Sequence, residues 1–158
     1  MLQFREVAVD APEAHALLEE YFAERIATFP DPAGYSTTHP DPAAFVPPNG
    51  VFLVVDDDEQ QRSVACGGIR RIDPGPDDAT RFEIKHLFVN PHGRGKGLGK
   101  ALLTDLEERA KGFGAREVVL DTNASLTAAG GLYRSSGYRT IEPYNDNPNA
   151  THWYAKNL

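Results

Sequence analysis

Apolar and polar positions along this chain follow spacings that predict strands and helices in succession. Residues 2–9 favour a first strand, and apolar residues then recur at helical spacing over residues 14–28. The apolar face of this predicted helix comprises Ala14, Leu17, Leu18, Tyr21, Phe22 and Ile26. Asp10, followed by Pro12 and Glu13, supplies the N-cap, the first-turn proline and the acidic residue that helix starts favour.

The central part of the chain predicts most of a sheet. Residues 51–55 are a continuous apolar run, which is typical of a strand buried on both faces. The other predicted elements are strands at 63–72, 81–89 and 116–121, a helix from 98 to about 111, a short helix around Tyr133, and a last strand in the tail from Ile141 onward, with Trp153-Tyr154-Ala155. The long helix carries an apolar face at Leu98, Leu102, Leu106, Ala110 and Phe113.

Residues 29–50 contain six of the 12 prolines, which excludes a long helix or a central strand there. Irregular connections of this length in a small domain are usually functional or disordered. Tyr35, His39 and Phe45 are candidate substrate-lid residues within it, and an ordinary surface loop is the alternative.

Composition narrows the class of protein. The 158 residues are expected to form one domain (1–158), with 41% apolar and 25% charged residues. A single cysteine excludes an internal disulfide, and the five histidines lack ligand spacing, so no metal site is predicted. Without a leader-like start or a long apolar run, a cytoplasmic protein is expected, with no membrane partner.

The distribution of charge points to a small anionic ligand. The net charge of −7 argues against nucleic-acid binding, which requires a basic surface. Residues 81–100 nevertheless hold five basic residues against one glutamate. A local cationic patch on an acidic protein suits a small polyanion.

Arg94-Gly95-Lys96-Gly97-Leu98-Gly99-Lys100 lies between the predicted strand at 81–89 and the following helix. A glycine-rich turn that opens a helix directs unpaired N–H groups to one point, at the positive end of the helix dipole. Glycines allow close approach, because a Cβ would hold an anion away. The segment therefore predicts phosphate binding, although it matches neither G-x-G-x-x-G nor the P-loop pattern.

Two motifs together resemble a known family. Arg94, Gly97 and Gly99 fit R-x-x-G-x-G, and Ala129-Gly130-Gly131-Leu132-Tyr133-Arg134-Ser135-Ser136-Gly137-Tyr138 fits A-x-x-L-Y-x-x-x-G-[FY]. This order and spacing is similar to that of the GCN5-related N-acetyltransferases. The resemblance, strongest over residues 81–140, implies an α/β (α+β) fold with a mixed, mostly antiparallel sheet of six to seven strands and about four helices. It also implies acetyl-CoA as co-substrate and a small-molecule or protein amine as acceptor.

The resemblance implies a donor site along the strand and the glycine loop. The donor-binding residues it implies are Leu87, Phe88, Val89, Arg94, Gly95, Lys96, Gly97, Leu98, Gly99 and Lys100. Backbone N–H groups around 87–89 would stabilise the oxyanion of acyl transfer. Many family members carry an asparagine where this chain has Leu126, so Asn123 is the candidate replacement for a contact with the pantetheine arm, or the contact is absent.

Tyr133 and Glu83 are the candidate catalytic residues. The resemblance makes Tyr133 the general acid that protonates the departing thiolate, and a core tyrosine that only positions the sulfur is the alternative. Glu83 lies eleven residues before Arg94, where some family members carry the base. Water as the proton acceptor, or a simple Glu83–Lys85 pair, remains open.

Strand alternation predicts two faces for residues 81–89. One face would carry Glu83, Lys85, Leu87 and Val89, and the other Phe82, Ile84, His86 and Phe88. His86 would then point away from Glu83.

The leading hypothesis is an acetyl-CoA-dependent N-acetyltransferase that works through direct attack in a ternary complex. A non-catalytic acyl-CoA-binding sensor or regulatory module is the alternative, because a fold does not fix a function. A different acyl donor or an oxygen acceptor also stays open. A homodimer is expected only from its frequency among soluble proteins.

Overall fold

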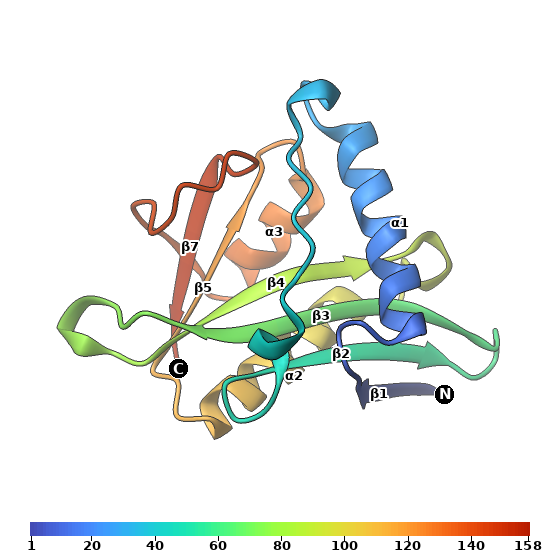
Figure 1. Cartoon of the computed structure of the whole chain (residues 1–158), viewed down its shortest axis with the longest axis horizontal. Helices are drawn as coiled ribbons and strands as arrows, with labels where there is room; N and C mark the ends of the chain where they lie inside the picture. Colours follow the sequence, from blue (N-terminus) through green and yellow to red (C-terminus); the bar gives the residue numbers. More distant parts are fainter.

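A computed structural model describes residues 1–158 and shows one seven-stranded mixed sheet (Figure 1). The strands are β1 (Leu2–Glu6), β2 (Gly50–Asp57), β3 (Arg62–Ile72), β4 (Arg81–Val89), β5 (Glu117–Thr122), β6 (Arg139–Thr140) and β7 (His152–Asn157). Their order in the sheet is β1-β2-β3-β4-β5-β7-β6, and only the β4–β5 pair is parallel. The expected mixed, mostly antiparallel sheet is confirmed.

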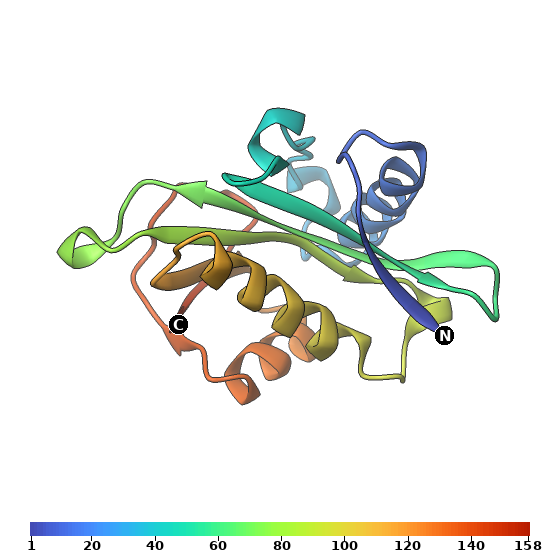
Figure 2. The same ribbon diagram turned by 90° about the horizontal axis from the view of Figure 1, so that it is seen from below.

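Three α-helices cover the two faces of the sheet. α1 (Pro12–Thr28) lies on one face, and α2 (Leu98–Gly112) and α3 (Thr127–Ser135) lie on the other (Figure 2). About four helices were expected. Residues 29–50, where a long helix was not expected, form only single 3-10 turns, at Pro32–Gly34 and Pro42–Phe45.

Apolar side chains fill both faces of the central strands. In β2, Val51, Leu53 and Val55 pack into the core beneath α2, whereas Phe52 and Val54 pack into the core beneath α1. The prediction that this apolar run is buried on both faces is therefore confirmed.

The start and the buried face of α1 differ from the sequence prediction. The helix begins at Pro12 with Ala11 as its N-cap, so Asp10 does not cap it. Ile26, expected on the buried face, is 39% exposed, whereas Arg25 is 6% exposed. Arg25 follows Tyr21 by four residues, and both line the cleft. Ile26 follows the buried Phe22 by four residues, but in the last turn of the helix this face is no longer covered.

Candidate active site

The parallel strands β4 and β5 separate as they approach the glycine loop. Their pairing ends at Glu83 opposite Val119, although β4 continues to Val89 and β5 to Thr122. Beyond Glu83, this edge of β4 has no neighbouring strand. An opening of this kind exposes backbone N–H and C=O groups that a ligand can bind.

A β-bulge in β4 changes which side chains face this opening. Phe88 pairs with Cys66, but the next pair is Lys85 with Gly68, and His86 adopts a φ of 57°. The extra residue reverses the alternation that a regular strand would have.

The predicted faces of β4 are therefore wrong after Lys85. Leu87 and Val89 pack toward the core beneath α2, so they do not share a face with Glu83. His86 does not point away from the Lys85 side, because both side chains line the same cleft. Phe88 packs into the core beneath α1.

A cleft of about 490 Å³ lies at the opening. Its walls come from α1, the 29–50 segment, β4, the end of β5, α3 and the loop before β7. The three lid candidates, Tyr35, His39 and Phe45, all line it, and so does Tyr133. Their contact with a substrate stays a prediction.

Tyr133 reaches the cleft from α3 and is 6% exposed. Its ring packs against the rings of Tyr138 and Tyr154, at centroid distances of 5.8 and 5.9 Å. Burial raises the pKa of its hydroxyl well above the ordinary value, so the group holds its proton at neutral pH. No protein hydrogen bond engages this hydroxyl, which leaves it able to donate to a ligand.

Glu83 lies behind the wall of the cleft. Its carboxylate is 1% exposed and accepts hydrogen bonds from Arg70 Nε at 2.9 Å and from the Tyr144 hydroxyl at 2.7 Å. Lys85 Nζ lies 3.8 Å away, and both Arg70 and Lys85 line the cleft, whereas Glu83 does not. The role of Glu83 as a base stays a prediction. A proton that moves from the cleft to Glu83 must pass Arg70 and Lys85.

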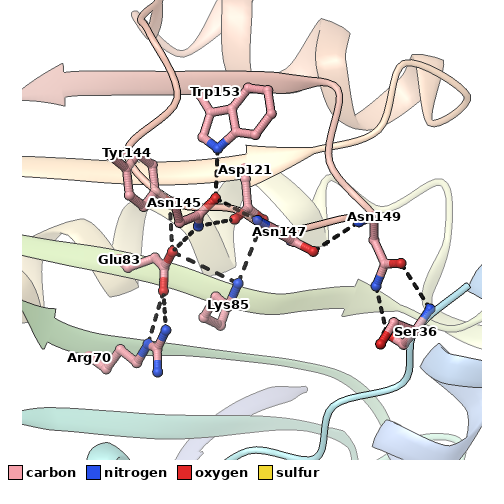
Figure 3. A network of polar contacts seen from close by, with 10 residues as sticks. All are labelled: Ser36, Arg70, Glu83, Lys85, Asp121, Tyr144, Asn145, Asn147, Asn149 and Trp153. Atoms are coloured by element: carbon pink, nitrogen blue, oxygen red, sulfur yellow. Dashed lines mark hydrogen bonds and ion pairs between the residues drawn. The ribbon is translucent and has the colours of Figure 1, made fainter.

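Figure 3 shows that Glu83 belongs to a wider polar network that the sequence did not indicate. Asp121 at the end of β5 pairs with Lys85 at 3.6 Å and accepts a hydrogen bond from Asn145 at 2.7 Å. Trp153 of β7 donates to Asn145 at 2.9 Å. These contacts join β4, β5, β7 and the loop before β7.

The same loop is tied to the segment over the cleft. Ser36 N donates to Asn149 Oδ1 at 2.9 Å, and Asn149 Nδ2 donates to Ser36 O at 2.6 Å (Figure 3). Asn123, the candidate pantetheine contact, donates to Asn149 O at 3.0 Å and accepts from Ser125 N. Its amide holds this loop and does not line the cleft, so a donor contact by Asn123 stays a prediction.

His86 is neutral in this environment. Its ring packs edge-on against Tyr21 and Phe22, at 5.6 and 5.9 Å. Burial, reinforced by the nearby charges of Lys85 and Arg70, lowers the pKa of His86 to about 3.

The glycine loop continues directly from the end of β4. The buried Asn90 starts it by accepting hydrogen bonds from His92 N and Gly93 N, at 3.1 and 3.2 Å. Gly95 and Gly97 have φ values of 81° and 70°, and a Cβ on either would meet nothing within 4 Å. From Gly95 to Lys100, the backbone N–H groups donate to no protein acceptor. The loop therefore offers a cradle of free donors at the start of α2, which suits a phosphate group.

The basic side chains of the loop differ in their partners. Arg94 forms an ion pair with Glu24 of α1, and Lys96 forms one with the buried Asp57 at 2.9 Å. Lys96 is the main cause that holds the pKa of Asp57 below its usual range. Lys100 is exposed and forms no ion pair in the structure.

Comparison with known proteins gives the family. The model of the acetyltransferase (GNAT) family matches residues 14–138. The chain belongs to this family. The GNAT match contains β4, the glycine loop, α2 and Tyr133, so the motifs that suggested the resemblance lie inside it.

Curated proteins of similar sequence support the GNAT assignment. An N-acetyltransferase of Schizosaccharomyces pombe is 36% identical over 102 residues, which are 65% of this chain and 60% of that protein. The chain matches less than two thirds of the length of this relative and of the other curated relatives compared.

Solved GNAT structures share the fold of the whole chain. A GNAT acetyltransferase of Staphylococcus aureus has a TM-score of 0.81 at 19% identity, covering 100% of this chain and 99% of that one. A GNAT acetyltransferase of Elizabethkingia anophelis, solved with acetyl-CoA bound, has a TM-score of 0.63 at 17% identity, covering 99% of this chain and 98% of its own.

No group of three or more His, Cys, Asp or Glu side chains is arranged to hold a metal ion. None of the helices has both the length and the apolar character needed to cross a membrane.

Proposed function

We propose that this chain transfers an acetyl group from acetyl-CoA to a primary amine of a small molecule or protein, by direct attack in a ternary complex. The observation that carries the proposal is the continuity between the glycine loop and the cleft. The edge of β4 that β5 leaves uncovered connects the free N–H groups at Gly95–Lys100 with the cleft that Tyr133 lines.

The glycine loop is the proposed site for the pyrophosphate of the donor. The free N–H groups of residues 95–100 and the dipole of α2 favour an anion there. The space beside Gly95 and Gly97 allows the phosphate to approach the backbone closely. Arg94 and Lys100 would add positive charge, and the uncovered edge of β4 at residues 87–89 would hold the pantetheine arm.

The chemistry requires the amine nitrogen to form a bond to the thioester carbonyl carbon while the carbon–sulfur bond breaks. Backbone N–H groups around Leu87 would stabilise the negative charge that develops on the carbonyl oxygen. The Tyr133 hydroxyl would donate its proton to the departing thiolate, because it is protonated, lies in the cleft and has no other partner.

The amine must lose a proton in the same reaction. We place Glu83 as the acceptor at the end of a relay, because its carboxylate is buried behind Lys85 and Arg70. A proton would pass from the amine through water beside Lys85, which lines the cleft and lies 3.8 Å from Glu83.

The proposal is tested by incubating the protein with acetyl-CoA and a panel of primary amines, including peptides with a free N-terminus. Release of the CoA thiol and the mass of the acetylated amine are measured together. Amine-dependent thiol release that Tyr133→Phe greatly slows supports the enzyme. Binding of acetyl-CoA without transfer to any amine would favour the non-catalytic binding module.

A further inference from the structure

Arg25 is a buried cation at the cleft that has no anionic partner. Its side chain projects from the last turns of α1 and is 6% exposed. Nε and Nη1 are fully buried and donate no hydrogen bond, and no carboxylate forms an ion pair with the guanidinium. Buried arginines are almost always paired, because an uncompensated charge is costly to remove from water.

Aromatic rings hold the guanidinium in place. The Arg25 Cζ atom lies 5.3 Å from the centre of the Tyr35 ring and 5.9 Å from that of Phe29. Burial raises the pKa of the Tyr21 and Tyr35 hydroxyls, and the adjacent guanidinium opposes this rise through its charge and through hydrogen bonding to them. Arg25, Tyr21 and Tyr35 all line the cleft. A fixed guanidinium flanked by two phenols is well suited to a carboxylate.

The other charged groups of the cleft are already engaged. Arg70 is paired with Glu83, and Lys85 lies between Glu83 and Asp121. The side chain of Asp41 accepts a hydrogen bond from the backbone N–H of Ala43. No carboxylate of the protein forms an ion pair with Arg25, and a bound anion would supply that partner.

We propose that the amine acceptor carries a carboxylate, and that this carboxylate binds Arg25. The acceptor class is then a free amino acid or another small amino-carboxylate, which fits a cleft of about 490 Å³. This inference rests on the proposed acetyl transfer. Arg25 and Tyr133 line the same cleft, so one small molecule bound there can present its carboxylate to Arg25 and its amine toward the end of the cleft that Tyr133 lines.

The carboxylate site is distinct from the predicted donor site. The glycine loop provides its own N–H groups for phosphate, and Glu24, the neighbour of Arg25 on α1, already pairs with Arg94 of that loop. Arg25 belongs instead to the wall formed with the 29–50 segment. Loss of Arg25 should therefore affect the acceptor and leave the donor unchanged.

The test compares L-amino acids with their own carboxamides, which keep the amine and the side chain but lack the negative charge. For each pair, kcat/KM is measured with saturating acetyl-CoA for the wild type, Arg25→Met, Arg25→Lys and the control Arg71→Met. Arg71 is exposed and unpaired, so this control removes one positive charge away from the cleft. Thermal unfolding and the KM for acetyl-CoA are measured for each variant.

The wild type and Arg71→Met should prefer the acids by at least about 30-fold, as the loss of a buried charge partner implies. Arg25→Met should reduce that preference to about 1, Arg25→Lys should retain part of it, and the KM for acetyl-CoA should not change. Equal rates for acids and amides in the wild type would overturn the inference while acetyl transfer stands. An unchanged preference in a folded Arg25→Met would also overturn it.

Failure of the proposed function gives a different result, namely no binding of acetyl-CoA and no thiol release with any amine. In that case, calorimetric binding of the same acids and amides still decides whether Arg25 holds a carboxylate. Preferential binding of the acids that Arg25→Met abolishes would support the site, and no preference would overturn it.

Discussion

Both carboxylate oxygens of Glu24 accept hydrogen bonds from Arg94 Nη2, at 2.6 and 2.7 Å. This pair joins α1 to the glycine loop across the end of β4. Arg94 is also bound through Nε to the carbonyl of Val89, at 3.1 Å. The cation that opens the glycine loop is therefore held by an internal carboxylate that a donor phosphate would have to replace or share.

Glu24→Gln should strengthen the binding of acetyl-CoA. The substitution removes a negative charge beside the loop and frees Arg94 for the phosphates. Since exposed ion pairs contribute about 0–1 kcal/mol, we expect a decrease in the Kd of about two- to fivefold. Calorimetry at low ionic strength measures it, with Glu20→Gln as the control, because Glu20 is exposed on the same helix and unpaired. Weaker binding by Glu24→Gln would show that the pair orders the loop.

Tyr133→Phe should lower kcat by about 10²-fold or more, as removal of a general acid does, without changing the Kd of acetyl-CoA. Tyr138→Phe is a matched control. Tyr138 is equally buried and donates to Glu107 at 2.6 Å, but it does not line the cleft. The rate of CoA thiol release, measured at saturating substrate, gives kcat for the two variants. A similar loss of kcat in both would mean that the tyrosine cluster acts only through packing.

His86 should make the fold sensitive to acid. Its pKa is about 3 in the folded protein and about 6.5 in the unfolded chain, so between these values only the unfolded chain binds the proton. Stability should then fall as the pH drops below about 6.5, by up to about 1.4 kcal/mol per pH unit.

His86→Asn removes this titration and tolerates the positive φ of the bulge. Between pH 6.5 and 5, we expect the wild type to lose about 1–2 kcal/mol of unfolding free energy relative to the variant. Denaturant titrations at several pH values measure the difference, with the exposed His15→Asn as the control. Parallel pH profiles for the wild type and His86→Asn would contradict the assignment.

Local sequence patterns predicted the elements of this fold well, but they could not predict where a strand departs from regularity. The residues of β4 alternate as in an ordinary strand, and nothing in 81–89 marks the bulge at His86. The bulge arises from pairing with β3 and from the absence of β5 beyond Glu83, which are long-range features.

The glycine loop and Tyr133 could be proposed from the sequence because each lies in a motif whose residues are close together along the chain. The network around Glu83 was missed because Tyr144 and Asn145 reach it from about sixty residues away. Arg25 did leave a signal, since it is a charged residue four positions after Tyr21, on a face expected to be apolar.

Whether the glycine loop binds the donor is decided by calorimetric titration of acetyl-CoA into the wild type, Gly97→Ala and Gly114→Ala. Both glycines have positive φ values, 70° and 96°, and a Cβ on either would meet nothing within 4 Å. Each alanine should therefore cost a similar ~1–2 kcal/mol of stability. We expect Gly97→Ala to weaken binding at least about tenfold, because its methyl group occupies the phosphate cradle, and Gly114→Ala to bind like the wild type. Equal binding by all three proteins, or no binding by the wild type, would contradict this expectation.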